Sequence, residues 1–176
     1  MNLLKKIGKS IAIAFSMYSK IPMVQFEWKE EDMRYSMCFF PLVGIVIGLL
    51  SWCWWLFCQQ FDIGKMCFAF VGIAIILLVT GGIHMDGYMD TMDALHSYGS
   101  REKKLEILKD PHAGAFAIAG CGVYLLLYTA AFSELRLEAF PAIGGIYVMT
   151  RALSGLSVLC FPKARKDGLA ATFAKG

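Results

Sequence analysis

Four long apolar runs divide the sequence, and polar segments separate them. The runs cover residues 37–58, 66–83, 113–132 and 140–161. A helix needs about 20 mostly apolar residues to cross a hydrocarbon core about 30 Å thick. The pattern therefore predicts four transmembrane helices. Trp52, Trp54 and Trp55 lie near the end of the first run, where an interfacial aromatic belt is expected.

A shorter amphipathic segment precedes the first run. Lys5, Lys6 and Lys9 stand before the apolar residues 11–15, and polar residues end this stretch by Lys20. The apolar part is too short to cross a membrane, and no clear cleavage site of a secretory signal follows it. We expect the segment to be retained and to form a helix that lies on the membrane surface.

The polar segment between the second and third runs contains the remaining predicted helices. Residues 86–93 place three aspartates at helical spacing, and residues 101–110 are strong helix formers that Pro111 ends. No internal repeat or linker marks a second domain. The predicted fold is all-α: a polytopic membrane helical bundle with about four transmembrane helices, an N-terminal interfacial helix and loop helices. We expect residues 1–176 to form a single integral membrane domain.

Composition agrees with a membrane protein and argues against nucleic-acid binding and against a cysteine-based metal or redox site. Hydrophobic residues make up 57% of the chain and charged residues 18%, and the mean hydropathy is +0.56. The net charge is only +3, and the basic residues are scattered, so we expect no binding of nucleic acid. The six cysteines lack metal-ligand or redox spacing and are predicted to be buried thiols.

The distribution of Lys and Arg predicts the orientation in the bilayer. If the N-terminus is cytoplasmic, the outer segments hold only Lys65 and Arg136 of the basic residues that lie between the runs. An excess of basic residues normally stays on the cytoplasmic side. We therefore expect a multi-pass protein of the cell (inner) membrane, with the segment between the second and third runs, and any active site there, facing the cytoplasm.

Three aspartates follow directly after the second apolar run. At about 100° per residue, Asp86, Asp90 and Asp93 fall at roughly 0°, 40° and −20° around a helix, so all three share one face. Carboxylates held this close repel one another unless a cation lies between them. A hard divalent ion such as Mg²⁺ takes carboxylate oxygens and often joins protein to substrate phosphates, so we predict a Mg²⁺ site here.

A second charged cluster precedes the third run. Lys103, Glu106 and Asp110 are predicted to share one helix face, where an ordinary surface helix with ion pairs is an equally good interpretation. Asp110 stands at the turn that leads into the third run. We expect Asp110 and Asp86 to face one another across one cytoplasmic mouth, with Glu106 as a further candidate metal ligand.

Phosphoryl transfer fits an acidic, metal-binding face with cations nearby. Arg151 interrupts the fourth run, and an arginine within a span usually faces a partner or a polar cavity. Arg151, Arg165, Lys103 and Lys109 are therefore candidate phosphate-binding residues, and His84 is the histidine best placed to line the site.

These motifs resemble the family of adenosylcobinamide-GDP ribazoletransferase, or cobalamin (5′-phosphate) synthase. The resemblance is most specific in residues 80–87, 90–93, 101–110 and 114–116. It extends to residues 19–22, 40–48 and 164–169 and to Arg151, and so covers nearly the whole chain.

The resemblance implies a membrane enzyme that joins adenosylcobinamide-GDP, a corrinoid nucleotide, to α-ribazole or its 5′-phosphate, with Mg²⁺ and release of GMP. A ribose hydroxyl of α-ribazole would attack the corrinoid-side phosphorus. Carried onto this sequence, the resemblance implies that Asp86, Asp90 and Asp110 hold metal and that Asp93 holds metal or acts as a base, with Asp90 and Asp93 as the catalytic pair.

The sequence departs from the family pattern at two places. Family members usually continue through further membrane segments, so we expect a C-terminally truncated family domain whose hydrophobic flank is unpaired or covered by a second copy in a homo-oligomer. His112 replaces an arginine that many members carry at this position.

Two other functions compete with this interpretation. A membrane phosphotransferase of the CDP-alcohol type also aligns aspartates around a metal, but its DGxxAR pattern is absent. After Asp86 and Gly87, the chain has Asp90 and Thr91 where that pattern has Ala and Arg. A cation transporter would need acidic residues near the middle of the spans, whereas these aspartates stand at the ends.

Overall fold

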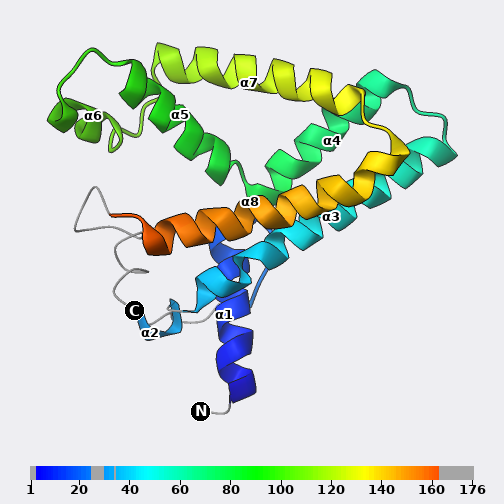
Figure 1. The fold of residues 1–176 in the computed structure, drawn as a ribbon, viewed down its shortest axis with the longest axis horizontal. Helices are drawn as coiled ribbons and strands as arrows, with labels where there is room; N and C mark the ends of the chain where they lie inside the picture. Colours follow the sequence, from blue (N-terminus) through cyan, green and yellow to red (C-terminus); the bar gives the residue numbers. More distant parts are fainter. Residues whose placement is uncertain (1–2, 25–29, 34, 163–176) are drawn as a thin grey trace. The chain divides into compact units, whose positions relative to one another are not determined.

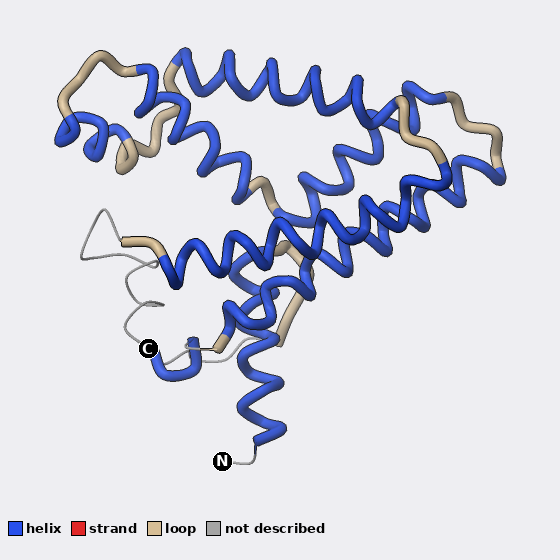
Figure 2. The backbone as a smooth tube through the Cα atoms, in the orientation of Figure 1, coloured by secondary structure: helices blue, strands red, loops and turns tan. Residues whose placement is uncertain are grey.

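The regular structure is helical throughout the residues that the computed structural model describes, which are 3–24, 30–33 and 35–162 (Figures 1 and 2). This confirms the predicted all-α class. The helices are α1 (Leu3–Tyr18), α2 (Glu30–Met33), α3 (Ser36–Gln60), α4 (Lys65–Thr80), α5 (Ile83–His96), α6 (Arg101–Ile107), α7 (Ala115–Ser133), the 3₁₀ helix η1 (Leu137–Ala139) and α8 (Phe140–Cys160).

Three helices are long and apolar enough to cross a membrane by themselves: α3, α7 and α8. Helices α4 and α5 meet the same criterion only as a pair, which is bent by 92°. The described part of the chain therefore contains three candidate spans, or four if the bent pair counts as one, as in a multi-pass membrane protein. The predicted runs 37–58, 113–132 and 140–161 agree with α3, α7 and α8 within about two residues at each end.

The chain forms two compact units, Met1–Leu56 with Arg136–Gly176, and Phe57–Leu135. In the first unit α1 buries Ile13 and Ala14, and α3 buries Val43 and Ile47. The rings of Tyr18 and Phe40 join these two helices, with their centroids 4.3 Å apart. The N-terminal segment is thus a helix, as predicted, and one face of it packs within the first unit.

Glycines in α3 allow α8 to approach closely. A Cβ added at Gly44 would overlap the backbone carbonyl of Tyr147 and lie 2.9 Å from Cα of Val148. One at Gly48 would lie 3.3 Å from Cα of Gly144. Small residues spaced by four are a common device for close helix packing in membranes. The glycines at 44 and 48 therefore fix the α3–α8 contact.

Replacing Gly44 with alanine should destabilise the protein by about 1–3 kcal/mol, because backbone rather than a flexible side chain must move. Gly145→Ala is the matched control: a Cβ there meets nothing within 4 Å. Thermal unfolding in detergent should show a lower midpoint for Gly44→Ala and an unchanged or higher one for Gly145→Ala. Equal midpoints for the two variants would contradict the close packing.

In the second unit, two glycines end α4 and turn the chain. Gly81 and Gly82 have φ of 63° and 74°, which is the left-handed region that side chains disfavour. The N–H groups of Gly81 and Gly82 cap carbonyls of α4, and α5 starts immediately afterwards. The predicted span 66–83 is therefore wrong at its end: the helix stops at Thr80.

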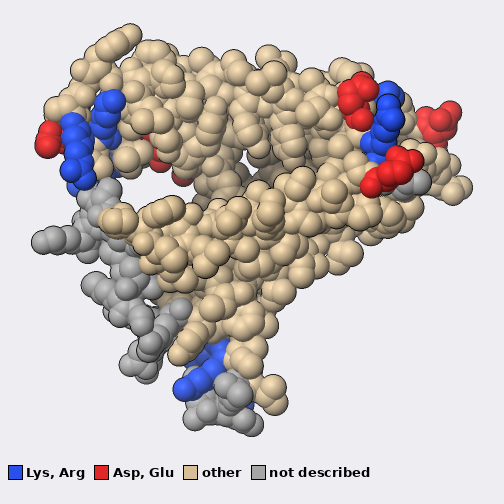
Figure 3. Space-filling model, in the orientation of Figure 1, with Lys and Arg blue, Asp and Glu red and all other residues tan. Residues whose placement is uncertain are grey.

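Helix α7 lies across the open side of the pair formed by α4 and α5 (Figure 1). Near its end, Phe132 stacks on Phe68 of α4, with ring centroids 5.1 Å apart. Helix α7 carries no charged residue, and Figure 3 shows no Lys, Arg, Asp or Glu over the middle of this helix. Many of its apolar side chains are exposed, among them Leu126 and Leu127, as expected of a surface that faces lipid.

The cysteines differ from the prediction. All six are free, in agreement with the absence of a redox pattern, but only Cys58 is buried. Cys38, Cys53, Cys67 and Cys160 are exposed on apolar helices, because a membrane helix turns apolar side chains outward as well as inward.

Candidate active site

Helix α5 carries the three predicted aspartates on one helical segment, Ile83–His96. Asp86 lies in its first turn, where a carboxylate interacts favourably with the positive end of the helix dipole. Asp86 is exposed, and Asp90 and Asp93 are half-buried. The prediction that these three aspartates lie on one helix is therefore confirmed.

The carboxylates of α5 do not form a closed metal cage. In the described part of the chain, no group of three or more His, Cys, Asp or Glu side chains is arranged to hold a metal ion. Asp86 and Asp90 stand one helical turn apart, at i and i+4. Mg²⁺ is commonly held by one or two carboxylates together with water and substrate phosphates, so this pair suits a site that the substrate completes.

Asp93 contacts the beginning of α7. Its Oδ2 accepts a hydrogen bond from the backbone N–H of Gly114 at 2.6 Å, and its Oδ1 accepts one from the N–H of Ala117 at 2.8 Å. Sequence reasoning missed both amides. The available signal was the glycine at the N-cap of α7, which has no side chain to cap the helix itself.

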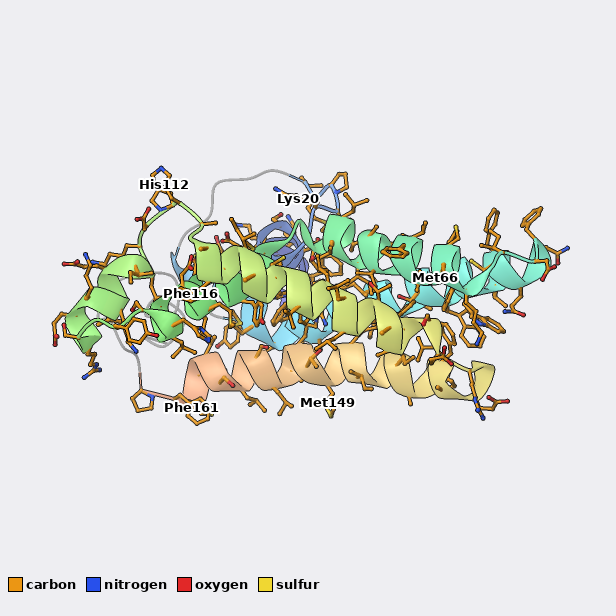
Figure 4. All side chains as sticks on the ribbon, turned by 90° about the horizontal axis from the view of Figure 1, so that it is seen from above. Lys20, Met66, His112, Phe116, Met149 and Phe161 are labelled. Atoms are coloured by element: carbon orange, nitrogen blue, oxygen red, sulfur yellow. The ribbon has the colours of Figure 1, made fainter. Side chains whose placement is uncertain are left out.

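The contact between α5 and α7 continues beyond Asp93. The Tyr88 hydroxyl donates to the carbonyl of Gly120 at 3.4 Å, and the rings of Tyr88 and Tyr124 lie 5.5 Å apart. The ring of His96 stacks on Phe116, with centroids 5.5 Å apart, and Figure 4 marks Phe116 at the start of α7. The face of α5 next to the aspartates is thus packed against α7.

Helix α6 is shorter than predicted. Ser100 caps it through the N–H of Lys103, and the helix ends at Ile107. Asp110 therefore lies beyond the helix, and the prediction that it shares a helix face with Lys103 and Glu106 is wrong. Pro111 disfavours a helical conformation at the residue before it, which accounts for the early end. Lys103 and Glu106 form an exposed ion pair at 3.0 Å.

Asp110 is held by its neighbour His112. The backbone N–H of His112 donates to Oδ1 of Asp110 at 3.0 Å, and Nδ1 of the imidazole lies 2.7 Å from the same oxygen. These hydrogen bonds, the backbone one first, lower the pKa of Asp110. The charge of Lys103 acts in the same direction. Figure 4 shows His112 on the loop that leads into α7.

Replacing His112 with alanine should raise the pKa of Asp110, because the ring donor is lost while the backbone donor stays. Since folding lowers this pKa, the interaction favours the folded loop above the unfolded pKa of aspartate and is lost as the pH falls through the folded one. Carboxyl ¹³C titration of labelled aspartate would measure the change. His96→Ala, on α5, is the control, and an unchanged Asp110 titration in His112→Ala would contradict the assignment.

The remaining predicted residues fall in different parts of the chain. His84 lies in the first turn of α5 and Lys109 in the turn after α6, and both are exposed. Arg151 belongs to α8 in the first unit, where Nη1 donates to Thr150 at 3.1 Å. Arg165 lies outside the described residues.

Comparison with known proteins agrees with the motif evidence. Residues 10–176 match the model of the cobalamin-5-phosphate synthase family. A protein of Lachnoclostridium phytofermentans named adenosylcobinamide-GDP ribazoletransferase is 51% identical over 93% of this chain and 63% of its own length. Proteins of the same name from Fusobacterium nucleatum (34% identity, 94% of this chain, 63% of the relative) and Desulfitobacterium hafniense (33%, 94%, 66%) are also similar.

The chain spans about two thirds or less of the length of these relatives. No solved structure matches it significantly. The family model nevertheless covers α5, α6 and α7 together with most of the remaining chain. On this evidence the chain belongs to the cobalamin-5-phosphate synthase family.

Proposed function

We propose that this chain transfers adenosylcobinamide phosphate from adenosylcobinamide-GDP to α-ribazole or to α-ribazole 5′-phosphate. The observation that carries the proposal is the pair Asp86, exposed, and Asp90, half-buried, one turn apart on α5, inside a chain that is 51% identical to a protein named for this reaction. The products would be adenosylcobalamin or its 5′-phosphate, together with GMP.

The residues of α5 fit the Mg²⁺ that we propose as cofactor. Asp86 and Asp90 would hold it, because they are like charges one turn apart and supply the hard oxygen ligands that Mg²⁺ prefers. Asp110, whose pKa the hydrogen bonds from His112 lower, is a third candidate ligand. Glu106 is a weaker candidate, because it already pairs with Lys103. When bound, the ion would neutralise charge on the diphosphate.

Basic residues would orient the phosphates of the substrate. Lys103 and Lys109 stand on α6 and in the turn after it, in the same unit as the aspartates, and their side chains are exposed. Arg151 and Arg165 remain candidates from other parts of the sequence, and His84 remains a candidate to line the site. We further propose that this polar segment faces the cytoplasm, where soluble nucleotides are available.

In the proposed reaction, a ribose hydroxyl of α-ribazole attacks the corrinoid-side phosphorus of the diphosphate. A new bond forms between that oxygen and the phosphorus, and the bond from phosphorus to the bridging oxygen breaks. GMP leaves with the bridging oxygen, and the hydroxyl proton passes to a base, for which an α5 carboxylate such as Asp90 is the candidate. Water must be kept from the same phosphorus, and the apolar helices around α5 would limit its access.

The test is direct conversion by the purified protein. Protein in liposomes is incubated with adenosylcobinamide-GDP, α-ribazole and Mg²⁺, and mass spectrometry follows cobalamin and GMP. The 51%-identical relative serves as the positive control. Formation of both products in equal amounts supports the proposal. GMP without cobalamin would indicate hydrolysis instead, and neither product, while the relative is active, would contradict it for this chain.

A further inference from the structure

The first turn of α7 lacks a cap of its own. A helix begins with backbone N–H groups that have no partner within the helix, and an N-cap side chain usually accepts from one of them. Here the N-cap is Gly114, which has no side chain. Asp93, more than twenty residues earlier in the sequence, accepts from Gly114 and from Ala117 instead. A residue of α5 therefore performs the capping of α7.

Both oxygens of Asp93 take part in this contact. Oδ2 meets Gly114 N at 2.6 Å and Oδ1 meets Ala117 N at 2.8 Å, which are distances typical of charge-assisted hydrogen bonds. Each oxygen keeps a further lone pair, but the two amides fix the position and direction of the carboxylate. This geometry separates Asp93 from Asp86 and Asp90, although all three stand on one helix face.

We propose that Asp93 is a positioning residue, which clamps the start of α7 to α5 and so holds the Asp86–Asp90 pair in register with the loop that leads into α7. This rests on the proposed function for what the pair does, but the clamp itself is independent of it. The proposal assigns Asp93 to this contact rather than to metal binding or proton transfer, and metal binding by variants tests that assignment.

The space around the clamp supports this role. A Cβ added at Gly114 would lie 2.8 and 2.9 Å from the two oxygens of Asp93. Six residues further along the same interface, a Cβ at Gly120 would lie 3.0 Å from atoms of Met92. Glycine at 114 thus lets the carboxylate reach two amides at once. Further along the same interface, Met92 of α5 packs closely against Gly120 of α7.

Amide hydrogen exchange tests the clamp without any substrate. In Asp93→Ala, exchange at Gly114 and Ala117 should rise about 10-fold or more, because two charge-assisted hydrogen bonds are lost. Asp93→Asn retains one acceptor and should fall between wild type and Asp93→Ala. Gly114→Ala should raise exchange at Ala117 by pushing the carboxylate away. Gly122→Ala, where a Cβ meets nothing within 4 Å, should leave Ala117 as in wild type.

Metal binding then distinguishes positioning from ligation. With Mn²⁺ alone as the probe, Asp93→Asn should bind with wild-type affinity, within about twofold, whereas Asp90→Asn should bind at least about tenfold more weakly. In the conversion assay, Asp93→Asn and Gly114→Ala should lower kcat on the order of 10- to 100-fold, with the Mg²⁺ concentration for half-maximal rate unchanged.

Two results would overturn the proposal. Unchanged exchange at Gly114 and Ala117 in Asp93→Ala would show that no clamp exists. A loss of Mn²⁺ affinity in Asp93→Asn as large as in Asp90→Asn would make Asp93 a ligand. If Asp93→Ala does not fold, Gly114→Ala and Asp93→Asn decide the first question. A wild-type protein that binds no Mn²⁺ counts against the proposed function alone, since exchange still reports the clamp.

Discussion

Replacing Asp90 with asparagine should lower the rate of cobalamin formation at least about 100-fold, and the same holds for Asp86→Asn. Each change removes one charged carboxylate from the proposed metal site on α5 while preserving the shape of the side chain. The charge stabilisation that a bound ion gives to a phosphoryl transfer amounts to several kcal/mol, and each 1.4 kcal/mol corresponds to about tenfold in rate. Mass spectrometry of product over time would measure the loss.

The matched control for these variants is Asp62→Asn. Asp62 belongs to the same unit, lies in the connection between α3 and α4, and has φ of 51°, which asparagine also tolerates. We expect it to retain the wild-type rate and the wild-type unfolding temperature. An Asp90→Asn protein that is folded and as active as Asp62→Asn would show that the Asp90 carboxylate takes no part in the reaction.

Removal of divalent metal should abolish product formation. Asp86 and Asp90 repel each other in the absence of a cation, and the substrate diphosphate would add further negative charge. The proposed site therefore needs a cation before the diphosphate can bind beside the two carboxylates. With EDTA the rate should fall to the background of a protein-free sample, and excess Mg²⁺ should restore it. Ca²⁺ should restore less of the rate, because it is larger than Mg²⁺ and does not impose the same octahedral geometry on its ligands.

The control for the EDTA experiment is a measurement of the helical fold before and after the metal is removed. Circular dichroism before and after EDTA should be unchanged, since the helices of this unit are held by packing and capping contacts among α4, α5 and α7 rather than by a metal. Turnover that persists undiminished in EDTA would exclude the proposed cofactor. Loss of helical signal would instead mean that a metal stabilises the fold.

Much of the fold could be predicted from the apolar runs. Helices α3, α7 and α8 follow continuous apolar stretches of a length that matches a bilayer, and their ends agree closely with the prediction. The second run was harder. Gly81 and Gly82 are apolar enough to continue a span by composition, yet their left-handed conformation ends the helix and turns the chain by 92°.

The candidate site was predicted in part, for similarly physical reasons. Helical spacing places Asp86, Asp90 and Asp93 on one face whatever surrounds them, so that feature depended only on local structure. The partner of Asp93 could not be found this way, because it depends on how α7 lies against α5. Asp110 was misplaced because helix propensity extended α6 past its actual end at Ile107.

Electron paramagnetic resonance of bound Mn²⁺ tests most directly whether the Asp86–Asp90 face of α5 holds a metal that binds substrate phosphate. Wild-type protein with Mn²⁺ and GMP should give a bound-metal signal with hyperfine coupling to ³¹P. The double variant Asp86→Asn, Asp90→Asn should lose both the bound signal and the coupling, while Asp62→Asn keeps them. An identical ³¹P-coupled signal in the double variant would contradict the account.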